Sequence, residues 1–270
     1  MPAAGLKNFF GRIGRTVHLL LDGTGRLAKL FAEVAGWSWR SLFHKKVISR
    51  ETFFQQLVVM GVDSVPIICL VGISVGTVLA LQAAYQLKQF GAVMYTGSLV
   101  SVSMARELGP LIASIVVAGR IGARIAAELG SMKVQEEVDA LTTMAIDPVR
   151  YLVFPRCLAL FLMLPCLTVI ADSIGMAGGF LIGTTSLGIE PYLYIEKNFD
   201  ALVLKDVYTG LFKSGAFALI IGLVSCYQGL AVEGGAEGVG RATTMAVVNS
   251  IVLIIVADCL FTAIFYYAFP

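Results

Sequence analysis

Charged residues and histidines are scarce in this sequence. Asp, Glu, Lys and Arg make up 14% of the 270 residues, and the two histidines, His18 and His44, both lie near the N-terminus. This scarcity leaves no histidine cluster or HExxH motif for a zinc site. Together with 57% hydrophobic residues and a mean hydropathy of +0.84, it also excludes an ordinary soluble domain and predicts an integral membrane protein.

A motif for nucleotide hydrolysis is missing too. The glycine-rich stretch EGGAEGVGRATT, residues 233–244, lacks the GK[ST] ending of a P-loop, and it separates two apolar segments rather than a strand and a helix. We expect a tight turn there instead. Since no catalytic constellation is recognisable elsewhere, the chain is predicted to be non-catalytic and to bind no cofactor or metal of its own.

The cysteines also lack the spacing of metal ligands. All five lie in or beside apolar segments, at Cys69, Cys157, Cys166, Cys226 and Cys259. We therefore expect buried thiols that act as small apolar residues.

The N-terminal segment lacks a sustained apolar core and a small-residue cleavage site, so no cleavable secretory signal is expected. Instead, apolar residues recur at helical spacing with basic residues between them, which is typical of a helix at the membrane interface. The apolar residues are Phe9, Phe10, Ile13, Val17, Leu20 and Leu21. Packing of this helix against the protein's own core is the alternative. We assign residues 1–52 to this interfacial region and residues 53–270 to the membrane domain.

The uncharged runs of the sequence can be joined into five predicted membrane spans. A spanning helix needs about 20 mostly apolar residues, so shorter neighbouring runs are joined across isolated charges. The predicted spans cover residues 60–86, 97–120, 151–184, 209–232 and 245–268. The third is long enough to tilt or to contain a break near Pro165 or the glycines after it. The predicted fold class is therefore an all-α integral membrane protein with five transmembrane helices.

Lys and Arg are distributed unequally between the two sides of the predicted membrane. Fourteen of them lie in the segment up to Arg50, in residues 120–150 and in residues 233–241. The opposite side holds three, Lys88, Lys197 and Lys205. The positive-inside rule then places the N-terminus in the cytoplasm, and five crossings leave the C-terminus on the other side.

Two adjacent charges, Arg106 and Glu107, interrupt the second predicted span in the stretch SMARELGPLIAS. A charge near the bilayer centre costs about 3 kcal/mol or more unless it faces protein, water or a polar ligand. Neighbours on a helix point about 100° apart, so these two cannot simply pair with each other. One hypothesis is a structural ion pair with Asp172 or Lys213. The other is a substrate site in which Arg106 meets an anionic head group.

A lipid site at these charges would also need an apolar wall for acyl chains. The first span offers four residues near its outer end: Leu79, Leu81, Gln82 and Tyr85. Arg106 and Glu107 are expected near the outer end of the second span. We therefore predict that the two sets meet.

Three isolated acids, Asp63, Asp172 and Asp258, lie in or near other spans. They could form a proton path, which would make the protein an ion-coupled secondary transporter. Roles at helix ends or in hydrogen bonds between helices are the alternative.

Between the second and third spans lies a short amphipathic stretch, EEVDALTTMAIDPVRYLVFPR, residues 136–156. On a helix, one apolar stripe would contain Val134, Val138, Leu141 and Ala145. Three acids would face away from this stripe, Glu136, Glu137 and Asp139. Asp147 and Pro148 are suited to cap and begin the next helix. The stretch therefore predicts a short cytoplasmic helix that is connected to two spans. It either binds a partner protein or lies on the surface without a partner.

Glycines at 175, 179 and 183 form two overlapping GxxxG steps. Small residues at this spacing let helices approach closely. The contact is expected either within the subunit or between two copies.

One long run carries a family resemblance. The sequence RELGPLIASIVVAGRIGARIAAELGSMKVQEEVDALTTMAIDPVRYLVFPR, residues 106–156, closely resembles the signature region of the MlaE (YrbE) family. Members of that family are permeases of ABC transporters that move phospholipids between bacterial membranes. KSGAFALIIGLVSCYQG at 213–229 and GGAEGVGRATTMAVVNS at 234–250 support the likeness. It covers nearly the whole chain after about residue 50.

The resemblance implies a homodimeric, multi-pass permease of the bacterial inner membrane, with an N-terminal elbow helix, five spans and a periplasmic C-terminus. It implies a cytoplasmic ATPase dimer that binds the ATP, often a small STAS-domain protein, and an extracytoplasmic MCE-domain hexamer, with no nucleic-acid partner. The segment matching 134–145 would be the coupling helix that docks in a groove of the ATPase. Arg106 and Glu107 would border the lipid cavity between the two subunits.

Overall fold

The computed structural model describes residues 50–268, together with residues 25, 29–30, 32–34 and 36 of the N-terminal segment. The apolar residues of the predicted interfacial helix, between Phe9 and Leu21, lie outside these described residues. Over the described residues the regular structure is helical without strands, which confirms the all-α prediction.

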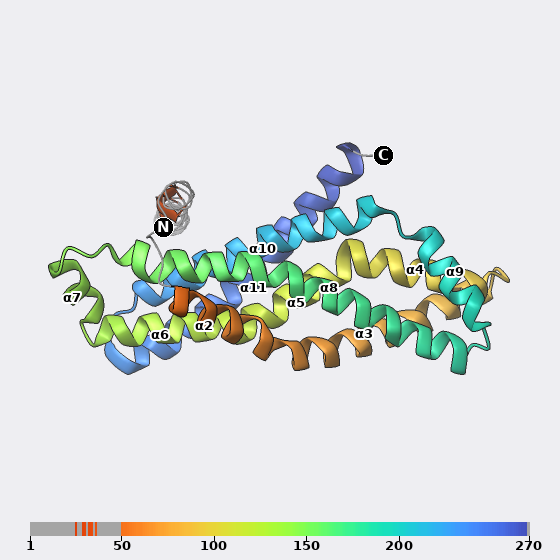
Figure 1. Cartoon of the computed structure of the whole chain (residues 1–270), viewed down its shortest axis with the longest axis horizontal. Helices are drawn as coiled ribbons and strands as arrows, with labels where there is room; N and C mark the ends of the chain where they lie inside the picture. Colours follow the sequence, from red (N-terminus) through yellow and green to blue (C-terminus); the bar gives the residue numbers. More distant parts are fainter. Residues whose placement is uncertain (1–24, 26–28, 31, 35, 37–49, 269–270) are drawn as a thin grey trace, which may run out of the picture.

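Five helical segments are long and apolar enough to cross a membrane, as predicted (Figure 1). They are Phe53–Lys88, Val93–Val134, Val149–Thr185, Leu204–Leu230 and Gly235–Tyr267. The helices extend past most of the predicted span ends because a helix continues across polar residues once its backbone hydrogen bonds are satisfied internally. The predicted number of five spans is therefore confirmed. The ends of the helices lie at turns rather than at the charged residues used to predict them.

The first two spans are assembled from several helical pieces. The first contains α2 (Arg50–Met60), a single turn of 3₁₀-helix η1 (Val62–Ser64) and α3 (Val65–Lys88). The second contains the 3₁₀ turn η2 (Val93–Tyr95), α4 (Thr96–Ser103), η3 (Met104–Leu108), α5 (Gly109–Val117), η4 (Ala118–Gly122) and α6 (Ala123–Val134). Both η3 and η4 are π-helical turns, which insert an extra residue into the helix and are frequent at functional sites.

The third span is one continuous helix after a π-helical start. The π-helical turn η5 (Val149–Val153) leads into α8 (Phe154–Thr185), which runs through Pro165 without interruption. Of the two alternatives for this long span, a break is therefore not found. A proline removes one backbone hydrogen bond, and a helix held by packed neighbours on both sides tolerates that loss inside a membrane; α3 and α10 both contact α8.

The glycines of α8 form a close contact within the subunit. The α-carbon of Gly76 in α3 faces the backbone of Gly175 so closely that a side chain there would collide with it. Gly72 faces Ala171, and Gly178 faces the backbone of Ile73. Of the two arrangements considered for these glycines, the structure therefore has the one within the chain.

Short helices occupy the two ends of the bundle (Figure 1). At one end lies α7 (Glu137–Thr143), and at the other lies α9 (Pro191–Ala201) beside the start of α4. Two serine hydroxyls fix α9 to α4: Ser98 donates to the Lys197 carbonyl over 2.8 Å, and Ser101 donates to the Asn198 carbonyl over 3.1 Å.

The last two spans are α10 (Leu204–Leu230) and α11 (Gly235–Ala268). Gly234 and Gly235 between them have φ of +87° and +70°, a left-handed conformation that favours glycine. Only the start of the glycine-rich stretch 233–244 is the predicted tight turn, because from Gly235 on the stretch belongs to α11.

Burial differs strongly among the spans. In the most apolar part of α10, 56% of residues are buried within the chain, against 28% for the first span and 11% for α11. The second half of α11 leans away from the other helices (Figure 1). The first and fifth spans therefore leave broad apolar faces for lipid or another subunit.

The five cysteines are free. Cys157 and Cys226 are buried, as predicted, whereas Cys166 and Cys259 are exposed. The expectation of burial is wrong for these last two because they lie on faces of α8 and α11 that this chain does not cover. The described residues contain no cluster of potential metal ligands.

Candidate functional site

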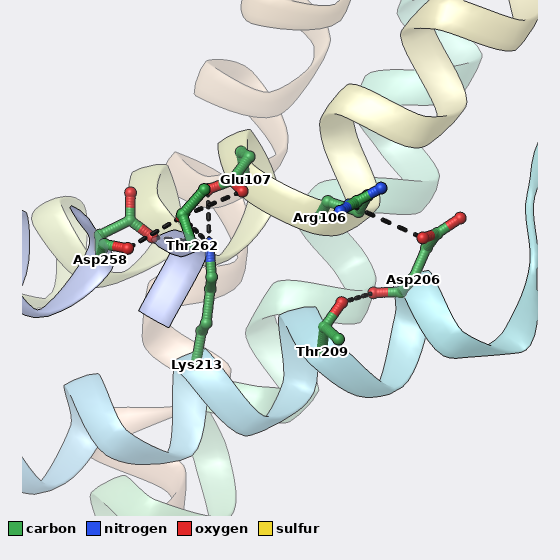
Figure 2. A network of polar contacts seen from close by, with 7 residues as sticks. All are labelled: Arg106, Glu107, Asp206, Thr209, Lys213, Asp258 and Thr262. Atoms are coloured by element: carbon green, nitrogen blue, oxygen red, sulfur yellow. Dashed lines mark hydrogen bonds and ion pairs between the residues drawn. The ribbon is translucent and has the colours of Figure 1, made fainter. Parts of the chain in front are cut away.

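A polar network joins three spans inside the apolar bundle (Figure 2). Lys213 of α10 donates to Glu107 of η3 over 2.5 Å, to Asp258 of α11 over 3.0 Å and to the Thr262 hydroxyl over 2.7 Å. The Thr262 hydroxyl also lies 3.2 Å from each carboxylate oxygen of Glu107. The network therefore holds the second, fourth and fifth spans together through one ammonium group.

The side chain of Lys213 is 1% exposed, so its charge depends almost entirely on these partners. An isolated buried ammonium would be strongly destabilising, whereas two carboxylates and a hydroxyl use all three of its N–H donors. Since Glu107 is 35% exposed, the network has one face open to the surroundings of the chain.

Arg106 points to a different partner from its neighbour (Figure 2). Its Nε lies 3.7 Å from Asp206 Oδ1 of α10, and its side chain is 43% exposed. This divergence confirms that the two adjacent charges do not pair with each other. Two partners were considered for these charges. Lys213 is one of them and pairs with Glu107, whereas Asp172 is not among the ion-pair partners of Arg106 in the described chain.

The π-helical turn explains how both charges reach α10. Pro110 has no backbone N–H, so the carbonyl four residues before it, that of Arg106, cannot accept a regular α-helical bond. The N–H of Gly109 donates to the carbonyl of Met104, five residues back. The wider turn changes the helical register at this point, and the sequence signal for it was the Gly-Pro pair after the charges.

Two of the four first-span residues predicted to meet these charges line a groove beside the second span. Leu79 and Gln82 line a groove of about 330 Å³ together with Leu108, whereas the exposed Leu81 and Tyr85 do not line it. Neither Arg106 nor Glu107 borders this groove. The ion-pair partners of both charges lie on α10 and α11, so their meeting with the first-span residues stays a prediction. Leu108 is the residue that connects the two regions.

The predicted surface helix is shorter than its apolar stripe. Val134 ends α6, and α7 covers seven residues between Glu136 and Ala145, whose φ values of +60° and +59° are left-handed. The stripe from 134 to 145 therefore does not lie on one helix, because these two residues reverse the chain at each end of α7.

Exposure within α7 nevertheless follows the predicted pattern. Val138 is buried and Leu141 is half-buried against the core, whereas the acids Glu136, Glu137 and Asp139 are exposed. Val134 and Ala145, outside the helix, are exposed as well.

Two contacts lie on either side of α7, one on α7 itself and one at the start of the third span. Lys133, near the end of α6, donates to both carboxylate oxygens of Asp139 over 2.8 and 3.0 Å. On the other side, the Asp147 carboxylate accepts from the backbone N–H of Val149 over 2.9 Å, at the start of the third span, as predicted. A side-chain ion pair therefore connects the short helix to α6, while the Asp147 cap fixes the start of the third span after it.

The three isolated acids have separate environments. Asp63 lies 3.9 Å from Arg120, and Asp258 belongs to the Lys213 network, so both have the interhelical roles considered for them. Asp172 lies beside Gly109 and has a buried Oδ1 without a hydrogen-bond partner in the described chain.

Asp206, Tyr194 and Asn198 were not identified by sequence reasoning. Tyr194 and Asn198 occur in PYLYIEKNFD, a short stretch between spans where no motif marks them. Tyr194 is fully buried between α4 and α8, and burial raises the pKa of its hydroxyl to about 12.

Comparison with known proteins decides the family. Residues 53–264 match the family described as Permease MlaE. The chain belongs to the MlaE permease family. A probable ABC transporter permease protein of Rickettsia felis is 45% identical over 212 residues, which cover 78% of this chain and 82% of that protein. One from Synechocystis is 39% identical, covering 78% of this chain and 80% of its own length.

A plant relative is also similar to this MlaE family member. The chloroplastic protein TRIGALACTOSYLDIACYLGLYCEROL 1 of Arabidopsis thaliana is 36% identical over 233 residues, which cover 86% of this chain and 66% of that protein. Membership of the family makes the chain a membrane permease subunit of an ABC transporter, which works with a separate ATPase. The predicted family, the multi-pass architecture and the role as a permease are thereby confirmed.

Proposed function

We propose that the chain, as a homodimer in the bacterial inner membrane, moves phospholipids between that membrane and an extracytoplasmic MCE-domain hexamer. A cytoplasmic ATPase dimer would bind and hydrolyse ATP, and a small STAS-domain protein is a further expected partner. The N-terminus would be cytoplasmic and the C-terminus periplasmic, following the Lys and Arg distribution.

The main support for a lipid substrate is the combination of charged and apolar surface along the second span. Arg106 is 43% exposed and Glu107 is 35% exposed, although both lie within a membrane-spanning segment. Next in sequence, Leu108 enters a groove whose exposed surface is entirely apolar. A phospholipid presents the complementary mixture of a charged head and apolar tails.

Dimerisation would bring the separated parts of this site together. The first and fifth spans are the least buried, and Leu79 and Gln82 lie on the first. A second copy covering these faces would close a lipid cavity between the subunits, with Arg106, Glu107, Leu79 and Gln82 at its border. Full transport by a monomer isolated in single-particle nanodiscs would contradict this arrangement.

Coupling to the ATPase would run through α7. The helix projects exposed acids at one end of the bundle; an ion pair connects it to α6, and the backbone after it runs directly into the third span. A partner that moves α7 would therefore move the second and third spans with it. The sequence has no P-loop that could hydrolyse ATP itself.

Charge reversal on exposed residues that make no contact with the core tests whether α7 couples the chain to the ATPase. Leu141 packs against the core, so Leu141→Asp would also unfold α7. We instead expect the double variant Glu136→Lys/Glu137→Lys to lower ATPase co-purification and lipid transport about tenfold or more, with unchanged membrane insertion. Both side chains are exposed.

The matched control is Glu190→Lys/Glu196→Lys, which reverses two exposed acids beside or on α9 at the opposite end of the bundle. This control should retain the ATPase. Normal ATPase co-purification and transport in the Glu136/Glu137 variant would contradict the proposal. Transport driven by a proton gradient without any ATPase would instead support the secondary-transporter alternative.

A further inference from the structure

A salt bridge connects the second and third spans on either side of α7. Arg156 lies in the first turn of α8, and its Nη2 donates to the Glu128 carboxylate of α6 over 3.4 Å. The two residues are 28 positions apart in sequence, and all of α7 lies between them. The contact therefore joins the end of the second span to the start of the third without passing through α7.

Burial makes Arg156 depend on this contact. Its side chain is 10% exposed, and Glu128 is the acid that pairs with it among the described residues. Breaking a buried ion pair is costly, whereas an exposed pair contributes little. Arg124 binds the same carboxylate from within α6, but its side chain is 50% exposed. Of the two arginines on Glu128, Arg156 is thus the buried one and the one that connects two spans.

Arg156 also contacts the π-helical turn η5 at the start of the third span. Its Nη1 donates to the Leu152 carbonyl over 2.8 Å. Pro155 has no backbone N–H, and the N–H of Phe154 donates to the carbonyl of Val149, five residues back. One guanidinium group therefore binds both the irregular start of the third span and α6.

The backbone alone is a soft connection between α7 and the third span. Residues 144–147, which join them, are outside any helix. A series of side-chain contacts bypasses this segment. Asp139 of α7 accepts from Lys133 of α6 over 2.8 Å, and Glu128 on the same helix accepts from Arg156. Rigid helices and salt-bridge networks of this kind carry coupling between distant sites.

We propose that Arg156 is a positioning residue that makes α6, α7 and the start of the third span move as one unit. This inference rests on the proposed function, in which an ATPase acts on α7. Without the salt bridge, α7 would still present its exposed acids to the ATPase. Its movement would then be absorbed by residues 144–147 before it reached the third span.

The first test measures the phospholipid moved per ATP hydrolysed. It uses the complete transporter complex, purified with its ATPase from the native host and reconstituted in phosphatidylethanolamine and phosphatidylglycerol vesicles. We expect Arg156→Gln to retain the ATPase but to lower this ratio about threefold or more, as loss of one contact in a coupling network does. Arg241→Gln removes an exposed ion pair within α11 and is the matched control, with an unchanged ratio. A merely structural role would reduce ATP hydrolysis and lipid movement in proportion, and that result would overturn the proposal.

A double variant separates coupling from stability. Glu128→Gln/Arg156→Gln removes both charges of the salt bridge and leaves only the half-exposed Arg124 without its partner. We expect a melting temperature near that of the wild type, because no buried charge is left unpaired. The lipid-to-ATP ratio should still be lowered about threefold or more. A wild-type ratio in this variant would show that coupling does not need the salt bridge and would refute the assignment.

Hydrogen–deuterium exchange of the purified full chain tests the contact without any reference to transport. Backbone amides of residues 149–153 report local opening of η5. We expect their exchange to become about threefold faster or more in Arg156→Gln, but not in Arg241→Gln. Unchanged exchange in Arg156→Gln would overturn the proposal.

Failure of the proposed function gives a different result. A wild-type complex that moves no lipid when ATP is added would refute that function. ATP-driven transport with equal ratios in the wild type and all variants would refute the role of Arg156 alone.

Discussion

Glu107 Oε2 lies 2.5 Å from Lys213 Nζ, and this ion pair connects the second span to the fourth. Asp258 on the fifth span binds the same ammonium at 3.0 Å. A single cation thus compensates two acids within the membrane domain, which makes the arrangement sensitive to loss of that cation.

The first prediction is that Lys213→Met lowers the free energy of unfolding by about 3–5 kcal/mol, because it leaves two carboxylates without their buried partner. Thermal unfolding of the purified protein measures this loss. Adding Glu107→Gln should restore part of it by removing one unpaired charge. Lys88→Met, at an exposed lysine, is the control. Equal melting temperatures for the Lys213 and Lys88 variants would contradict the structural role of the network.

Arg106 should behave differently from Lys213. Its contact with Asp206 is long, at 3.7 Å, and its side chain is 43% exposed, so Arg106→Gln should cost less than about 1 kcal/mol of stability. If Arg106 contacts lipid head groups, the same variant should reduce bound phospholipid and transport. Measuring lipid occupancy and melting temperature together decides the matter. Unchanged bound lipid with a large loss of stability would leave Arg106 a structural residue only.

The contact between Gly76 and Gly175 predicts opposite effects for two glycine substitutions. Gly76→Ala would press a methyl group into the backbone of Gly175 and should destabilise the protein by about 1–3 kcal/mol. Gly119→Ala, in a helical segment with open space around it, should instead stabilise by about 0.5–1 kcal/mol. Comparing their melting temperatures checks the prediction. Similar tolerance of both substitutions would show that α3 and α8 are not packed at this point.

Tyr194 predicts a loss of stability in alkali. Burial raises its pKa to about 12 in the folded chain, above the ordinary value of about 10. Between these values the folded state holds more protons than the unfolded state, so stability should fall as pH rises above about 10. Tyr194→Phe should reduce this decline, whereas Tyr192→Phe, exposed on the same helix, should not. Melting temperatures between pH 9 and 11.5 measure the effect, and identical pH profiles for both variants would contradict it.

The architecture of five spans follows from the sequence because it depends on local quantities. Length and apolar content decide whether a segment crosses a membrane, and Gly234 and Gly235 determine the turn before α11 through their backbone freedom. The exposure of Glu137 and Asp139 within α7 follows from the helical period in the same way. Whether Pro165 breaks α8 does not follow from the sequence, because the effect of a proline depends on neighbouring helices rather than on α8 alone.

The partners of the membrane charges depend on tertiary structure. Glu107 and Lys213 are 106 residues apart in sequence, and Lys213 and Asp258 are 45 apart, so no local period relates them. The π-helical turn before Pro110 changes the direction of Arg106 and Glu107, and their ion-pair partners lie on α10. Local sequence determined which segments cross the membrane, whereas the packing of distant helices decided which polar groups are paired.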